Sequence, residues 1–167
     1  KENSHMYDKV PTSMNFVERE KKVEKFWEEN HIFEKSIDNR KKGETYTFYD
    51  GPPTANGKPH IGHVETRVIK DMIPRYRTMK GYRVPRKAGW DTHGLPVELS
   101  VEKALGITKE DIGKKISVAD YNAACRKDVM KYTKEWEDLT HQMGYWVDMK
   151  HPYITYDNRY LSLIHIS

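Results

Sequence analysis

Two stretches in the first half of the chain repeat apolar residues at the spacing of a helix. The first predicts a helix over 15–30, and Asn15 can cap its amino end. The second predicts a helix over 60–80, and Gly81 is well placed to end it. Pro74 lies inside the second pattern, so we expect a kink or an early break there.

The second half of the chain carries one longer amphipathic pattern, over 117–143. Ser117 can cap it together with Asp120, and Gly144 provides a stop. We therefore expect one long helix. Cys125 lies on its apolar face and is expected to be an ordinary core residue rather than a nucleophile.

Two short stretches rich in β-forming residues predict strands over 45–50 and 82–90. The first runs into the turn 51–53, and the second runs into a loop, while the stretch 97–115 is ambiguous. Strand, turn, helix, strand and helix in this order begin a parallel α/β sheet, in which ligands bind beyond the carboxyl ends of the strands.

Composition excludes several classes of protein but does not identify one. The chain has 167 residues, with 32% charged and 11% aromatic residues, which suits one folded domain rather than disorder. The net charge of +4 tolerates a polyanion such as ATP or tRNA, although a basic surface without a partner is equally compatible. The single cysteine excludes an internal disulfide and a Cys-x-x-Cys zinc knuckle. No apolar run approaches the ~20 residues of a membrane span, so we expect a soluble cytoplasmic protein.

The segment GPPTANGKPHIGH, residues 51–63, has the features of a phosphate site. His60 and His63 lie in the first turn of a predicted helix, whose unpaired N–H groups and dipole favour anions. Imidazole N–H groups can stabilise the charge on a phosphorus centre during substitution. Gly62 leaves room for a flat base to approach the backbone. The histidine pair could instead ligate a metal or belong to a structural loop, but no other clustered ligand stands nearby.

The segment GWDTHGLPVE, residues 89–98, follows the second predicted strand. Asp91 and His93 lie in its loop, and a carboxylate there can hold an ammonium group. Trp90 and Leu95 can help to wall an apolar pocket. Alternatively, Asp91 merely caps the following turn.

Both segments resemble one enzyme family. PTANGKPHIGH resembles the HIGH signature of class I aminoacyl-tRNA synthetases, and GWDTHGLPVE resembles isoleucyl-tRNA synthetases in particular. Valyl enzymes show GTDHAG at the second motif, methionyl enzymes resemble GTDEHG, and leucyl enzymes lack the histidine. The likeness covers residues 7–160. It implies an α/β fold, the first half of a Rossmann-like parallel-sheet catalytic domain preceded by an N-terminal helix.

The resemblance also implies roles for individual residues. His60 and His63 would be catalytic, because they would stabilise the α-phosphate under attack by the isoleucine carboxylate. Asp91 would bind the α-ammonium group of isoleucine. The implied ATP-binding residues are Pro53, Thr54, Asn56, Gly57, His60, Gly62 and His63. The implied isoleucine-binding residues are Gly51, Pro52, Asp91 and His93.

The partners follow from the same likeness. The whole enzyme would use ATP with Mg²⁺ to activate isoleucine and transfer it to tRNA(Ile), as a monomer without a membrane partner. No zinc site or other metal site is expected within this fragment. The KMSKS loop, the editing domain and the anticodon-binding helices of the family are not among the 167 residues. We therefore expect the fragment alone to be inactive.

The expected organisation has four parts. Residues 1–5 are upstream translation or a cloning remnant, 6–44 an N-terminal helical extension, 45–160 the first half of the catalytic domain, and 161–167 a non-native tail. Two rival functions remain open. One is a small nucleotidyltransferase that shares the HxGH loop, and the other is a non-catalytic nucleotide- or RNA-binding module derived from a synthetase.

Overall fold

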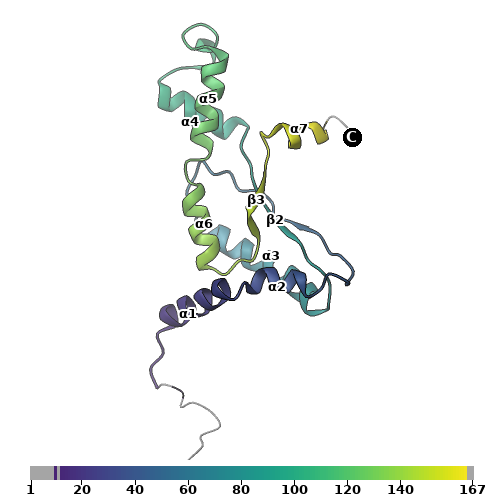
Figure 1. Ribbon diagram of the computed structural model, residues 1–167. Coiled ribbons are helices and arrows are strands. Elements are labelled where there is room, and N and C mark those ends of the chain that lie inside the picture. The colour runs from purple at the N-terminus through teal and green to yellow at the C-terminus, as the bar shows by residue number, and fades with distance from the viewer. Residues whose placement is uncertain (1–9, 11, 165–167) are drawn as a thin grey trace, which may run out of the picture.

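The computed structural model describes residues 10 and 12–164 (Figure 1). Its strands form a parallel sheet in the order β1–β2–β3. The predicted α/β class with parallel strands is confirmed. The elements are α1 (Phe16–Glu29), α2 (Ile32–Asp38), β1 (Phe48–Tyr49), α3 (Ile61–Met79), β2 (Arg86–Trp90), α4 (Leu95–Leu105), the 3₁₀ turn η1 (Lys109–Asp111), α5 (Val118–Val129), α6 (Thr133–Gln142), β3 (Asp148–Ile154) and α7 (Asn158–Ile164).

The sheet is short and irregular. Phe48 of β1 pairs with Arg86 of β2, and single parallel bridges extend this pairing on both sides of the short strands. Between β2 and β3 the register shifts, so that Gly89 lies opposite Tyr153. The sequence does not predict β3, because DMKHPYI lacks a clear alternation of apolar and polar residues.

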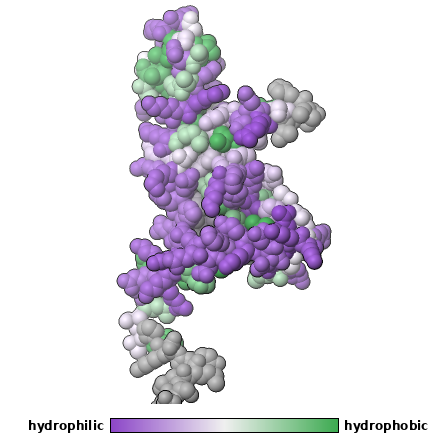
Figure 2. Space-filling view, in the orientation of Figure 1, coloured by the Kyte–Doolittle hydropathy of each residue, from purple (hydrophilic) through white to green (hydrophobic). Residues whose placement is uncertain are grey.

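Helices surround this sheet and also extend beyond it. Figure 1 shows α4 and α5 side by side as a projection at one end of the molecule, and α1 at the other end. The surface in Figure 2 is mostly hydrophilic, with apolar side chains gathered on the α4–α5 projection. The exposed apolar residues there are Leu95, Leu99, Leu105 and Val118. None of the helices in the described part of the chain is long and apolar enough to cross a membrane.

The predicted helix ends are largely correct. Asn15 caps α1 by accepting a hydrogen bond from the Glu18 amide at 3.3 Å, and Ser117 caps α5 in the same way. Gly81 and Gly144 follow α3 and α6 with positive φ angles of 94° and 63°. This left-handed conformation suits glycine at a helix end.

One expectation for the helices was wrong, and half of another was not met. The single helix expected over 117–143 is divided into α5 and α6, because the chain turns at Tyr132 to donate its amide hydrogen to the Ala55 carbonyl at 3.0 Å. At Pro74, where we expected a kink or an early break, the helix does not break and α3 continues to Met79, while the kink stays a prediction. Pro74 is fully buried, and packing offsets the missing hydrogen bond.

The exposed face of α3 is unusually apolar. The apolar side chains whose spacing predicted this helix point largely to solvent, whereas its buried residues are Arg67, Pro74 and Thr78. The exposed residues are Val68, Ile69, Met72, Ile73, Tyr76 and Met79. An apolar stripe of this kind marks an interaction surface.

Two buried clusters lie in the core of the described chain next to the sheet. One joins Ala55, Trp90 and Trp136, and the other contains Ala88, Tyr145 and other residues next to β3. The first cluster takes one residue from the loop after β1, one from the end of β2 and one from α6. The core therefore directly supports the loops that carry both sequence motifs.

Gly89 is expected to tolerate no side chain. A Cβ atom at Gly89 would lie 2.2 Å from Cζ of Tyr153, whose hydroxyl donates to the Asp50 carbonyl. Gly89→Ala should therefore displace the tyrosine ring and lower stability by about 1–3 kcal/mol. The midpoint of thermal unfolding measures this effect. Gly57→Ala is the control, because a Cβ there meets no atom within 4 Å, and equal midpoints for both variants would contradict the expectation.

Candidate active site at the carboxyl edge of the sheet

Both motif loops leave the sheet at the same edge. The first follows β1 and the second follows β2, and these strands are adjacent and parallel. The loops are also joined directly, since the Asp91 amide donates to the Pro53 carbonyl at 3.0 Å and Thr54 forms a parallel bridge with Asp91. The expected position of both motifs beyond the strand ends is confirmed.

A cavity of about 660 Å³ lies between the first loop and α3. Five of the residues expected to bind substrates line it, and so do five others. The expected residues are Gly51, Pro52, Pro53, Thr54 and His63, and the others are Thr66, Arg67, Ile69, Lys70 and Trp136. The remaining expected residues, Asn56, Gly57, His60, Gly62, Asp91 and His93, do not line this cavity.

The two histidines form a reciprocal cap at the amino end of α3. Nδ1 of His60 accepts a hydrogen bond from the Gly62 amide at 3.2 Å, and Nδ1 of His63 accepts one from the His60 amide at 3.1 Å. The ring centroids are 3.7 Å apart. Since Nδ1 is the acceptor in both neutral rings, the hydrogen-bond network assigns the proton to Nε2. Each ring therefore has an N–H donor that the cap does not use.

The surroundings of His63 favour its neutral form. Burial lowers its pKa, and electrostatic interactions with His60, Arg67 and Lys70 lower it further. The ring also lies edge-on to Trp136, with centroids 4.6 Å apart. A neutral imidazole at pH 7 can donate a hydrogen bond without being a charged acid.

The turn at Asn56 and Gly57 is anchored from two other parts of the chain. The Asn56 side-chain amide donates to the Pro96 carbonyl at 3.3 Å, and Nε1 of Trp136 donates to the Gly57 carbonyl at 2.9 Å. Gly62 has a separate packing constraint, because a Cβ there would lie 3.1 Å from Cε1 of His60. The small size of Gly62 therefore lets the His60 ring fold over the start of the helix.

The Asp91 carboxylate remains accessible. Its side chain is 41% exposed, with Oδ1 4.0 Å from Nδ1 of His93 and 3.5 Å from the Thr155 hydroxyl. Thr155 is held in turn by the Thr92 amide, which donates to its hydroxyl oxygen at 2.9 Å. The loop after β2 is thus fixed against the end of β3, while the carboxylate can accept further hydrogen bonds.

Three charged residues of this region are not among those expected from the sequence: Asp50, Arg67 and Lys70. The Asp50 carboxylate is buried at the end of β1, where it pairs with Lys70 and lies 3.9 Å from Nη2 of Arg67. The sequence contains a hint of this contact. Asp50 lies directly before the Gly-Pro-Pro turn, and Arg67 and Lys70 lie three residues apart on the next predicted helix. That spacing places the cations on one helix face, but their common partner is apparent only in three dimensions.

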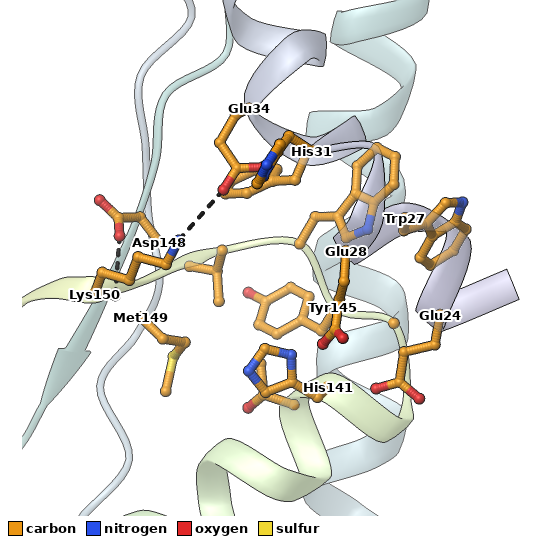
Figure 3. Close-up of a pocket in the computed structure, with 15 residues that line it drawn as sticks. Glu24, Trp27, Glu28, His31, Glu34, His141, Tyr145, Asp148, Met149 and Lys150 are labelled. Atoms are coloured by element: carbon orange, nitrogen blue, oxygen red, sulfur yellow. Dashed lines mark hydrogen bonds and ion pairs between the residues drawn. The ribbon is translucent and has the colours of Figure 1, made fainter. Parts of the chain in front are cut away.

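One group in the described part of the chain could hold a metal ion. Ligand atoms of Glu24, Glu28 and His141 lie within 4.8 Å of one another. Figure 3 shows them in a second cavity, of about 380 Å³, where Glu24 and Glu28 reach from α1 toward His141 of α6. None of the residues expected to bind substrates lines this cavity. Two carboxylates and an imidazole suit a divalent transition metal, so the expectation of no metal site stays untested.

The parallel sheet and its two motif loops define the class of protein. The chain belongs to the family of class I tRNA synthetases, because the family model for tRNA synthetases class I (I, L, M and V) matches residues 22–165. Among curated proteins it is 75% identical over 144 residues to the isoleucine–tRNA ligase of Bacteroides thetaiotaomicron. It is 70% identical over 138 residues to that of Porphyromonas gingivalis and 54% identical over 159 residues to that of Clostridium novyi.

These alignments cover most of the chain but little of the relatives. They include 86%, 83% and 95% of the chain, and only 12%, 12% and 15% of the respective ligases. Among solved structures, the chain is similar to agnB2 LeuRS from Agrobacterium radiobacter K84, determined as a ternary complex with tRNA and LeuAMS. The TM-score is 0.65 at 21% identity, covering 91% of the chain and 18% of LeuRS, and this likeness confirms the fold.

Proposed function

We propose that this chain is the part of an isoleucine–tRNA ligase that binds ATP and isoleucine. The observation that carries the proposal is the direct joining of the two motif loops at one edge of a parallel sheet. One loop ends in a helix that presents two imidazoles, and the other presents an accessible carboxylate. A phosphate group and an ammonium group could therefore bind next to each other.

On the ATP side, His60 and His63 act as donors to the α-phosphate. The isoleucine carboxylate oxygen forms a bond to the α-phosphorus while the bond to the pyrophosphate oxygen breaks. The Nε2–H groups then stabilise the negative charge that develops on the phosphoryl oxygens, and the Mg²⁺ of the Mg-ATP substrate would shield the phosphates. Pro53, Thr54, Asn56, Gly57 and Gly62 form the rest of the ATP site.

On the isoleucine side, Asp91 accepts hydrogen bonds from the α-ammonium group, with His93 next to it. Gly51 and Pro52 provide the apolar wall for the side chain. Their position in the lining of the 660 Å³ cavity supports this role. Because Gly51 has no side chain, the branched aliphatic group can approach the backbone.

The remaining steps require more chain than the 167 residues. The complete enzyme transfers isoleucine to tRNA(Ile) and works as a cytoplasmic monomer, with residues 45–160 as the first half of its catalytic domain. Further chain would cover the apolar face of α3, a surface too apolar for a permanently exposed helix. The 167 residues alone would lack charge stabilisation on the pyrophosphate side and are expected to be inactive. Residues 161–164 lie within α7, whereas 165–167 of the proposed non-native tail lie outside the described residues, as do 1–5.

Amino-acid-dependent exchange between pyrophosphate and ATP tests the proposal. The full-length protein that carries this segment should show the highest kcat/KM with isoleucine, above valine, leucine and methionine. Exchange without any amino acid would support the nucleotidyltransferase instead. ATP binding without exchange would support the non-catalytic module, and either result would contradict the proposal.

A further inference from the structure

A buried carboxylate joins the end of β1 to the middle of α3. Asp50 is 2% exposed, pairs with Nζ of Lys70, and lies 3.9 Å from Nη2 of Arg67. Its amide donates to the Lys87 carbonyl at 2.9 Å, and its carbonyl accepts a hydrogen bond from the Tyr153 hydroxyl. Asp50 therefore has a fixed position in the sheet, directly before Gly51.

Arg67 extends this contact to α6. Its side chain is buried, Nη1 donates to the Thr140 hydroxyl, and the guanidinium lies 4.9 Å from the Trp136 ring centroid and 5.3 Å from that of Tyr145. Burial lowers the pKa of Arg67, and the negative charge of Asp50 opposes that shift. A buried charge that loses its partner is strongly destabilising, so Asp50 offsets part of the cost of burying the Arg67 guanidinium.

The same residues border the candidate active site. Arg67 and Lys70 both line the 660 Å³ cavity and lie one turn and two turns beyond His63 on α3. Trp136, which packs on Arg67, also contacts the His63 ring and holds the Gly57 carbonyl. Two cations on adjacent turns that share one carboxylate restrict the rotation of a helix about its axis.

We propose that Asp50 is a positioning residue, which fixes the rotation of α3 through Lys70 and Arg67 and thereby sets the direction of the His63 ring toward the first loop. This inference rests on the proposed function, because its consequence is measured in the adenylation reaction. Asp50 does not line the cavity and need not touch a substrate. Its loss should therefore affect the alignment of reacting groups more than the affinity for either substrate.

The test uses Asp50→Asn in the full-length protein, with isoleucine-dependent pyrophosphate exchange as the measurement. We expect kcat to fall by about 10-fold or more, because small misplacements of reacting groups are costly. The KM values for isoleucine and ATP should change by less than about 3-fold, because the substrate contacts remain. Lys70→Met should also lower kcat, and the double variant should lose less than the product of the two single effects.

The matched control is the pair Lys134 and Asp138 on α6, which lie 3.1 Å apart with 82% and 65% of their side chains exposed. Lys134→Met and Asp138→Asn should leave kcat unchanged, alone and together. An unchanged kcat in Asp50→Asn, a rise in KM alone, or independent effects at 50 and 70 would overturn the inference.

Absence of isoleucine-dependent exchange in the unmodified full-length protein would instead contradict the proposed function. The contact between Asp50 and Lys70 would then be tested by the thermal unfolding midpoints of Asp50→Asn, Lys70→Met and the double variant. Non-additive shifts of the unfolding midpoint would support the proposed restraint on α3, and additive shifts would overturn it.

Discussion

Replacing His63 with asparagine should lower the rate of isoleucine-dependent pyrophosphate exchange by about 10²–10³-fold, the usual effect of removing one preorganised donor. The oxygen of an asparagine side chain can take the place of Nδ1 and accept the His60 amide hydrogen, which lies 3.1 Å from Nδ1. The cap at the start of α3 would be kept, while the donor at Nε2 would be lost. Steady-state kinetics of the full-length protein measure the change.

His63→Gln is the matched comparison, because its amide nitrogen can reach the former position of Nε2. We expect it to retain more activity than His63→Asn. His151→Ala is the control, since His151 lies exposed on β3 and pairs with Asp148. If His63→Asn retains the unmodified rate, or if glutamine and asparagine reduce the rate equally, the donor role of His63 is wrong.

The second large effect is expected at Asp91. Asp91→Asn should raise the KM for isoleucine far more than the KM for ATP, because the ammonium group would lose its charged partner. Breaking a buried pair of this kind costs about 2–5 kcal/mol. The side chain is 41% exposed, so solvent screening places the expected cost toward the lower end. Exchange kinetics with each substrate varied in turn separate the two KM values.

Asp157→Asn is the matched control for this prediction. Asp157 follows β3 at the same end of the sheet and pairs with the exposed Arg159. It should leave both KM values unchanged. An equal rise of both KM values in Asp91→Asn would point to a structural role for the loop, in agreement with the alternative that Asp91 only caps a turn.

Local signals in the sequence predicted the framework of the site. The capping residues Asn15 and Ser117 and the terminating glycines act on their own helix ends, so their effect can be read without tertiary structure. The loops after β1 and β2 were placed correctly for a related reason. Turn residues directly after a β-rich stretch mark the strand end, and parallel strands bring such ends to one edge.

Contacts between distant residues explain what the sequence did not predict. The division of α5 from α6 depends on a hydrogen bond from Tyr132 to Ala55, and the burial of Asp50 depends on cations seventeen and twenty residues later in the chain. The spacing of apolar residues correctly predicted α3 as a helix. It could not show that Arg67 lies on the buried face while Val68 and its apolar neighbours face solvent.

The proposed binding of ATP at the first loop and of isoleucine at the second also explains where the charged side chains lie. Arg67 and Lys70 of α3 line the cavity next to the first loop, and after burial they contribute to the lowered pKa of His63, an arrangement that suits an anionic phosphate. The second loop carries the accessible carboxylate of Asp91, which suits a cationic ammonium group. The two substrate groups would thus meet where the Asp91 amide binds the Pro53 carbonyl.

The most direct test is a crystal structure of the full-length protein with a non-reactive analogue of isoleucyl-adenylate. We expect the group that replaces the α-phosphate to lie within hydrogen-bond distance of Nε2 of His60 or His63, and the ammonium group to lie on the Asp91 carboxylate. The isoleucine side chain should contact Gly51 and Pro52. An analogue bound away from both loops, or bound with its ammonium group far from Asp91, would contradict the account.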